Sequence, residues 1–92
     1  MLTAAEVEAR SSALLAAAQA AMTQLNYPNA TAILNDLLNL PPNRHTRAAQ
    51  EMAGLARARS GDVARARIEF ETYLQLYPQG DGSDRVRREL AA

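Results

Sequence analysis

The chain repeats itself at an interval of 36 residues, and this repetition limits most strongly how it can fold. Residues of the same character recur in the same order, starting at a helix-capping type and ending at a proline. The matched pairs are Asn26 and Asp62, Ala30 and Ala66, Leu34 and Phe70, Leu37 and Tyr73, Leu38 and Leu74, and Pro42 and Pro78. A repeat period of this size is typical of architectures in which each unit is one supersecondary element. The repetition therefore predicts that one amphipathic helix, with the same start and stop, occurs twice.

The apolar spacing within and around the two copies predicts helices and no strands. Apolar residues recur three and four positions apart, and no segment alternates with a period of two over a useful length. Thr3 and Glu6 have the form of a capping box, and Asp62 is a capping type. We expect an all-α fold of about five helices: one from Thr3 to near Asn26, one ending before Pro41, one over 46–59, one from Asp62 to before Pro78, and a short one capped by Ser83.

These helices fit a single domain over residues 1–92. Repeat one covers about 10–42, repeat two about 46–78, and a capping helix about 83–92. One antiparallel helix pair cannot bury both faces of its apolar stripe, so a second pair must stack on it and a further helix must cover the end. In the fourth helix we expect Val63, Ala66, Phe70 and Tyr73 to face the core.

The second unit resembles the tetratricopeptide repeat (TPR) family. Gly54, Gly61 with Asp62, Ala66, Phe70 and Pro78 stand where that family has its small helix A residue, its turn, its small helix B residue, its aromatic residue and its final proline. The resemblance implies an α-α superhelix that acts as a non-enzymatic protein-protein interaction module or assembly scaffold. Residues 68–80 are most similar to the final repeats of bacterial envelope and pilus-assembly members. This implies a bacterial protein, cytoplasmic or periplasmic, with the envelope favoured.

The same resemblance places a concave groove along the first helix of each unit, where a peptide or helix segment would bind. The residues implied to line it are Leu15, Gln19, Met22, Glu51, Met52, Leu55 and Arg59. Because the chain contains no lysine, the family's clamp for a terminal carboxylate is missing. We expect the groove to prefer an amphipathic or apolar segment on a methionine and leucine floor. The alternative is that these side chains pack against a neighbouring repeat.

No group of residues in the sequence predicts catalysis. His45 is the only histidine and has no nucleophile near it in the sequence, so we expect it in an exposed loop or at a helix start. Asp81, Ser83 and Asp84 lack the ligand pattern of a calcium loop and are better explained by helix capping. Cysteine is absent, which excludes disulfides and thiolate zinc sites. We therefore expect no enzyme activity, no metal and no cofactor.

Ten basic residues, all arginines, balance ten acidic residues, so no net charge favours nucleic acid or an anionic membrane. Most arginines have an acid four residues away, and we expect ion pairs within helices. The pairs are Glu6 and Arg10, Arg47 and Glu51, Arg65 and Glu69, Arg67 and Glu71, and Arg85 and Glu89. For Arg57, Arg59, Arg87 and Arg88 we expect no local ion pair. We expect partners to be proteins or peptides, with no nucleic acid and no membrane insertion.

Two alternative functions remain open at the level of sequence. The first helix is apolar on more than one side, and repeat stacks normally need about three units, whereas this chain has two and a half. This predicts a homo-oligomerisation module that dimerises through residues 7–25. The other alternative is a regulatory or nucleic-acid-binding helical domain of a larger protein.

Overall fold

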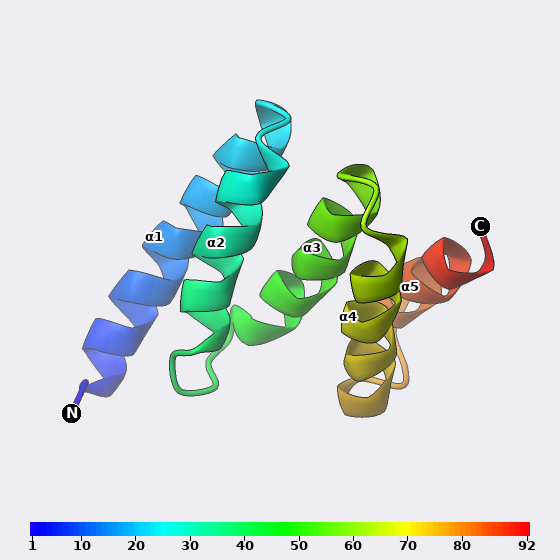
Figure 1. Ribbon diagram of the computed structural model, residues 1–92. Coiled ribbons are helices and arrows are strands. Elements are labelled where there is room, and N and C mark those ends of the chain that lie inside the picture. The colour runs from blue at the N-terminus through cyan, green and yellow to red at the C-terminus, as the bar shows by residue number, and fades with distance from the viewer.

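The computed structural model describes all residues 1–92 and consists of five α-helices without strands (Figure 1). The helices are α1 (Ala4–Thr23), α2 (Tyr27–Leu38), α3 (Thr46–Arg59), α4 (Val63–Leu76) and α5 (Asp81–Ala91). The predicted all-α fold of about five helices is thus confirmed. None of the helices is long and apolar enough to cross a lipid bilayer.

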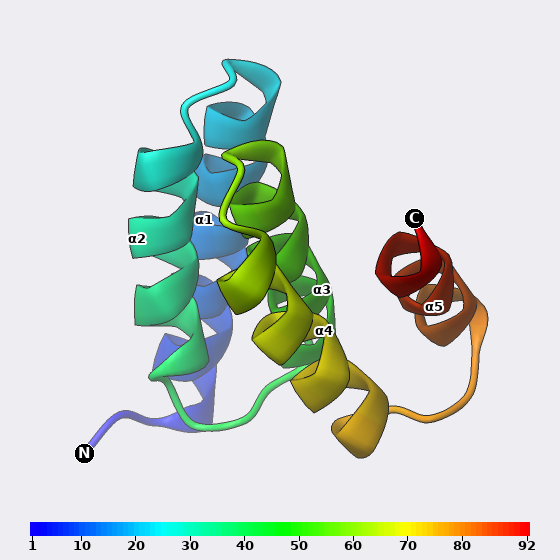
Figure 2. The same cartoon turned by 45° about the vertical axis from the view of Figure 1, so that its right-hand side comes forward.

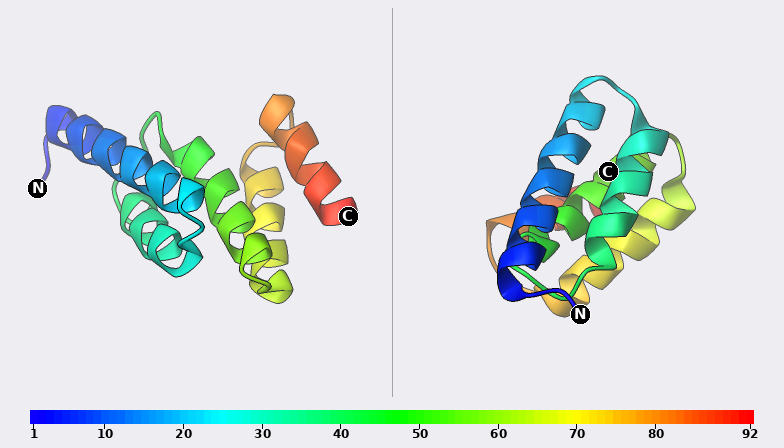
Figure 3. Two further views of the ribbon diagram at one scale, coloured as in Figure 1. Left: turned by 90° about the horizontal axis from the view of Figure 1, so that it is seen from above. Right: turned by 90° about the vertical axis from the view of Figure 1, so that its left-hand side faces the viewer.

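The helices form two antiparallel pairs followed by a single helix. Each helix packs against the next one in the chain, so that α2 joins the first pair to the second (Figures 1 and 2). In addition α3 contacts both α1 and α5, whereas α2 and α4 do not touch each other. Viewed from above, α1, α3 and α5 follow one side of the molecule, and α2 and α4 follow the other (Figure 3). One face is therefore built from the first helix of each pair together with α5.

Side-chain caps start three of the helices where the sequence predicts them. At α1, the Glu6 backbone N–H donates to the Thr3 hydroxyl at 3.1 Å, and the Glu6 carboxylate accepts from the Thr3 backbone N–H at 3.0 Å. Asn26 and Asp62, which match in the repeat, each accept a hydrogen bond from the backbone three residues on. The first helix ends at Thr23, slightly earlier than expected, because the chain must turn before the Asn26 cap.

The turn inside each pair uses a residue with positive φ at the same repeat position. In the second pair this residue is Gly61, with φ of 88°. In the first pair it is Leu25, with φ of 59°, a conformation that is costly for a residue with a β-carbon. The repeated backbone geometry is therefore kept even where the sequence does not supply glycine.

Two apolar clusters form the core, one for each junction between units. The first joins α1, α2 and α3 through residues that are mainly small: Ala18, Ala21, Ala30, Leu34, Leu37, Ala49, Ala53 and Ala56. The second joins α4 to α5 through Ala66, Phe70, Tyr73 and Val86, with Leu55 of α3 packed against it. Alanine-rich contact surfaces let helix axes approach closely, so few large side chains are needed to fill the first cluster.

Gly54 and Phe70 make the closest approach between α3 and α4. A β-carbon added at Gly54 would lie 2.9 Å from Phe70 Cζ and nearer still to two other ring carbons, which is too close for any real contact. The Phe70 ring is only 3% exposed. The prediction that Phe70 faces the core is confirmed, and the missing β-carbon at Gly54 allows α3 and α4 to approach closely there.

Two expectations about α4 and α5 are wrong. Val63 is 68% exposed, because it is the first residue of α4 and lies beyond the end of the second cluster. Ser83 does not cap α5, since that helix starts two residues earlier at Asp81 with Gly80 in the capping position. Ser83 is fully buried instead, and its hydroxyl donates to the Tyr77 carbonyl oxygen. It ties the first turn of α5 to the end of α4.

Candidate interaction groove between α3 and α5

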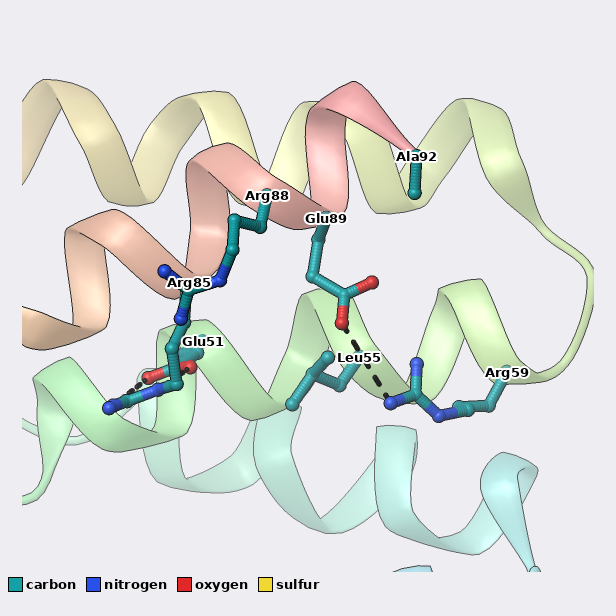
Figure 4. A pocket seen from close by; sticks show the side chains of 7 residues that line it. All are labelled: Glu51, Leu55, Arg59, Arg85, Arg88, Glu89 and Ala92. Atoms are coloured by element: carbon teal, nitrogen blue, oxygen red, sulfur yellow. Dashed lines mark hydrogen bonds and ion pairs between the residues drawn. The ribbon is translucent and has the colours of Figure 1, made fainter.

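Two adjoining clefts lie on the face that α3 and α5 share. The first has a volume of about 390 Å³ and is lined by Glu51, Leu55, Arg59, Arg85, Arg88, Glu89 and Ala92 (Figure 4). The second has a volume of about 470 Å³ and is lined by Arg44, Arg47, Ala48, Glu51, Tyr73, Gly80, Asp81, Gly82 and Arg85. Because Glu51 and Arg85 border both clefts, we treat the two as one feature, the α3/α5 groove.

The structure brings three of the seven sequence-predicted groove residues together. Glu51, Leu55 and Arg59 of α3 all line the first cleft (Figure 4). Leu15, Met22 and Met52 are partly buried and pack against the first core cluster. Gln19 is exposed on α1 and lines neither cleft. The predicted set is thus divided: three residues line the groove, three pack against the first core cluster, and Gln19 does neither.

A bidentate ion pair crosses the centre of the groove. Arg85 donates from Nε to Glu51 Oε2 at 2.8 Å and from Nη2 to Glu51 Oε1 at 3.0 Å. The hydrogen bonds to Glu51, and then the charge of its carboxylate, raise the pKa of Arg85 above its ordinary value. The Glu51 side chain is only 14% exposed, whereas the Arg85 side chain is 54% exposed. The acid is therefore withdrawn into the floor, and the cation lies on the surface.

A second, looser ion pair borders the other end of the first cleft. Arg59 Nη2 lies 3.8 Å from Glu89 Oε1, and the Leu55 side chain lies between this pair and the Glu51–Arg85 pair (Figure 4). Arg88 also lines the cleft, but it makes no ion pair and no side-chain hydrogen bond. The first cleft thus has an apolar floor at Leu55 with arginines on both sides of it.

Arg47 holds the end of the groove where α4 meets α5. Its Nε donates to the Tyr73 hydroxyl at 2.8 Å, and its Nη2 donates to the Gln79 carbonyl oxygen at 2.9 Å. Its Cζ lies 5.5 Å from the centre of the Tyr73 ring and 5.0 Å from that of the Tyr77 ring, which gives cation–π attraction. No carboxylate lies within ion-pair distance of this guanidinium. Arg47 therefore adds positive charge to the groove while it fixes the α4–α5 connection.

The predicted ion pairs within helices do not form, and this corrects the charge pattern expected from the sequence. Glu51 binds Arg85 instead of Arg47, and Glu89 lies by Arg59 instead of Arg85. Arg65 pairs with Asp62, and Glu69 accepts from the buried Gln50 amide. Three arginines expected to lack partners have acids: Arg57 with Asp62, Arg59 with Glu89, and Arg87 with Asp84. Packing of α3 against α5 brings the acids to Arg59 and Arg85, whereas Arg65 and Arg87 pair with acids three residues away in the sequence.

His45 lies at the start of α3, which is one of the two positions expected for it from the sequence. Its side chain, however, is only 15% exposed. Its Nε2 is 3.3 Å from Glu8 Oε1, and Arg44 Nε is 3.7 Å from the same oxygen. Glu8 belongs to α1, so this cluster is the only polar side-chain link between the first helix pair and the rest of the chain. It joins the two units across the loop that follows α2.

Sequence reasoning missed the arginines that α5 contributes to the groove. The segment 47–53 of α3 is matched by 85–91 of α5 at an interval of 38 residues, which makes Arg85 the equivalent of Arg47. This repetition was the available signal that α5 presents the same polar face as α3.

No group of three or more possible metal ligands is present in the chain. Comparison with protein-family models, with curated proteins and with solved structures found no match.

Proposed function

We propose that this protein is a non-enzymatic interaction module of tetratricopeptide type that binds a peptide or helical segment in the α3/α5 groove. The observation that carries the proposal is the groove itself, where α3 and α5, far apart in the sequence, line two adjoining clefts that share Glu51 and Arg85. Small-residue contacts in the core and a row of helix pairs support the family assignment.

The groove has the chemical parts that a peptide site requires. Leu55 supplies apolar surface at the floor, and the surrounding guanidinium groups can donate hydrogen bonds to backbone carbonyls or to side-chain oxygens. The walls are held in place by the Glu51–Arg85 bond and by Arg47. Binding would then require little reordering of the protein, which favours affinity.

An unbiased peptide library tests this proposal. Peptides selected on the immobilised protein should produce amide chemical-shift changes that cluster on α3 and α5. Leu55→Ala should weaken binding, whereas Leu76→Ala on α4, where the leucine is exposed and outside the groove, should not. Selected peptides whose shifts map to α2 and α4, or whose affinity is equal for both variants, would contradict the site.

Self-assembly is a second candidate function, and the outer face of α1 favours it. The exposed residues of this helix include Ala5, Ala9, Ala13, Ala16 and Ala20, which form a smooth stripe of small side chains. At the other end, α5 carries exposed Asp84, Arg87 and Arg88. A terminal repeat with a polar outer face is a cap, so the N-terminal end is the uncapped end of the stack. A second copy would cover α1 through its own stripe.

A further inference from the structure

We propose that the segment bound in the α3/α5 groove is acidic, with carboxylates on both sides of a single apolar residue. This inference rests on the proposed peptide-binding function and specifies the chemistry of the partner. The apolar residue would contact Leu55, and the carboxylates would contact the arginines at either end of the cleft.

The first observation in support is that groove arginines outnumber the acids able to neutralise them. Arg44, Arg47, Arg59, Arg85 and Arg88 line the two clefts, against Glu51, Glu89 and Asp81. Arg47 and Arg88 have no carboxylate within ion-pair distance, and the Arg44 side chain is largely exposed beside Glu8. An acidic ligand would supply the missing partners, and arginine binds carboxylates in a bidentate geometry.

The second observation is that the two acids of the first cleft, Glu51 and Glu89, are placed where they repel such a ligand least. Glu51 is partly buried beneath Arg85, which donates two hydrogen bonds to it. Glu89 faces Arg59. In the first cleft the surface that a ligand meets therefore presents mainly guanidinium groups, although the chain as a whole carries no net charge. Local charge of this kind steers oppositely charged partners and sets specificity.

The position of Leu55 selects an acidic peptide over a nucleic acid. An apolar floor between arginines matches an apolar side chain between carboxylates, whereas a phosphate backbone offers nothing to bury there. Proteins that bind single-stranded nucleic acids present exposed aromatic side chains on which the bases stack. Here Phe70 and Tyr73 are buried, and Tyr77 faces the Arg47 guanidinium. The groove thus contains charge without a stacking platform.

The test uses a fluorescein-labelled synthetic peptide with two aspartates on each side of one leucine. Its control replaces every aspartate by asparagine. Binding is measured by fluorescence anisotropy at low and at high salt, with the native chain, with Arg88→Glu, and with Arg67→Glu as the matched control. Both arginines are exposed, and neither makes an ion pair, but Arg67 lies on α4 outside the groove. Circular dichroism verifies that both variants fold.

We expect the acidic peptide to bind more tightly than the asparagine peptide and to weaken with salt. Arg88→Glu should reduce its affinity by about five- to tenfold, as the loss of one surface ion pair and the gain of one repulsion imply. Arg67→Glu should change it by less than about twofold. A peptide with lysines in place of the aspartates should gain affinity for Arg88→Glu, which a merely structural role for Arg88 would not produce.

Three results would overturn the inference. The asparagine peptide could bind as tightly, the two arginine variants could weaken binding equally, or a single-stranded RNA could compete with the peptide in an Arg88-dependent manner. The last result would assign the groove to nucleic acid. If the acidic peptide fails while the unbiased library yields neutral peptides that depend on Leu55, the inference is refuted and the proposed function stands.

Discussion

Replacing Gly54 by alanine should destabilise the protein, although the same change in an ordinary helix interior stabilises by about 1 kcal/mol. The new β-carbon would lie 2.9 Å from Phe70 Cζ and overlap two further ring carbons. Because the ring is buried between helices, it cannot move aside without disturbing Tyr73 and Val86. Overpacking of this kind costs about 1–3 kcal/mol. With the propensity gain of about 1 kcal/mol subtracted, we expect a net loss of up to about 2 kcal/mol.

The sign of this effect should reverse when the ring is removed. Phe70→Ala alone should cost about 3–5 kcal/mol, the usual range for a buried phenylalanine. In that background the methyl group of Gly54→Ala would occupy vacated space, and the helix gains its propensity term of about 1 kcal/mol. The coupling free energy between the two positions should therefore be about 1–3 kcal/mol.

Urea denaturation followed by far-ultraviolet circular dichroism measures all four forms of this cycle. An osmolyte added equally to each sample keeps Phe70→Ala folded. Ile68→Ala is the matched control on the same helix, since Ile68 is 60% exposed, and it should change stability by less than about 1 kcal/mol. If Gly54→Ala stabilised both backgrounds equally, α3 and α4 would not approach as described. If Phe70→Ala lowered the free energy of unfolding by less than about 1 kcal/mol, the ring could not be part of the core.

Further predictions concern the α4–α5 connection, the first helix turn and the outer face of α1. Arg47→Ala should cost about 2 kcal/mol and speed amide exchange throughout α5, because the bonds to Tyr73 and Gln79 are lost. The Thr3 hydrogen bonds lower the pKa of Glu6, so its stabilising contribution is full above pH 4.5 and lost as pH falls through the lower native pKa. A carboxyl titration by NMR checks that pKa, and Glu6→Gln should remove this pH-dependent loss of stability. Sedimentation equilibrium should show a concentration-dependent dimer that Ala16→Glu, an exposed change, abolishes.

The helices of the repeat could be predicted from sequence because their signals are local. The bounds of α3 agree with the prediction, and the caps at Thr3, Asn26 and Asp62 form. The start of α5 could not be predicted, because Gly80 and Gly82 suggest a loop. Gly82 is in fact the second residue of the helix and lies against the Tyr73 hydroxyl, where a β-carbon would overlap that oxygen. Its glycine reflects tertiary packing, which a local pattern does not reveal.

The charge pairing failed for a related reason. A pair four residues apart on one helix stabilises by only about 0.3–0.5 kcal/mol, so a better partner on another helix displaces it. Arg85 reaches Glu51 with two short hydrogen bonds in a partly buried position, where charge-assisted bonds are stronger. The spacing of charges along the sequence therefore indicates which helix face is polar, but not which residues pair once helices meet.

The groove shows the same division between local pattern and helix packing. Met22, Met52 and Leu55 belong to similar apolar stripes, and spacing alone treats them alike. Met22 and Met52 pack against the first cluster, to which α1, α2 and α3 all contribute, and neither lines the groove. Leu55 packs against the second cluster, which α4 and α5 form, but it also lines the cleft between α3 and α5, to which α5 brings Arg85 and Arg88. The position of the last helix thus converts a core-type residue into the floor of a charged cleft, and the chemistry of that cleft comes from a segment whose sequence indicates only a solvated cap.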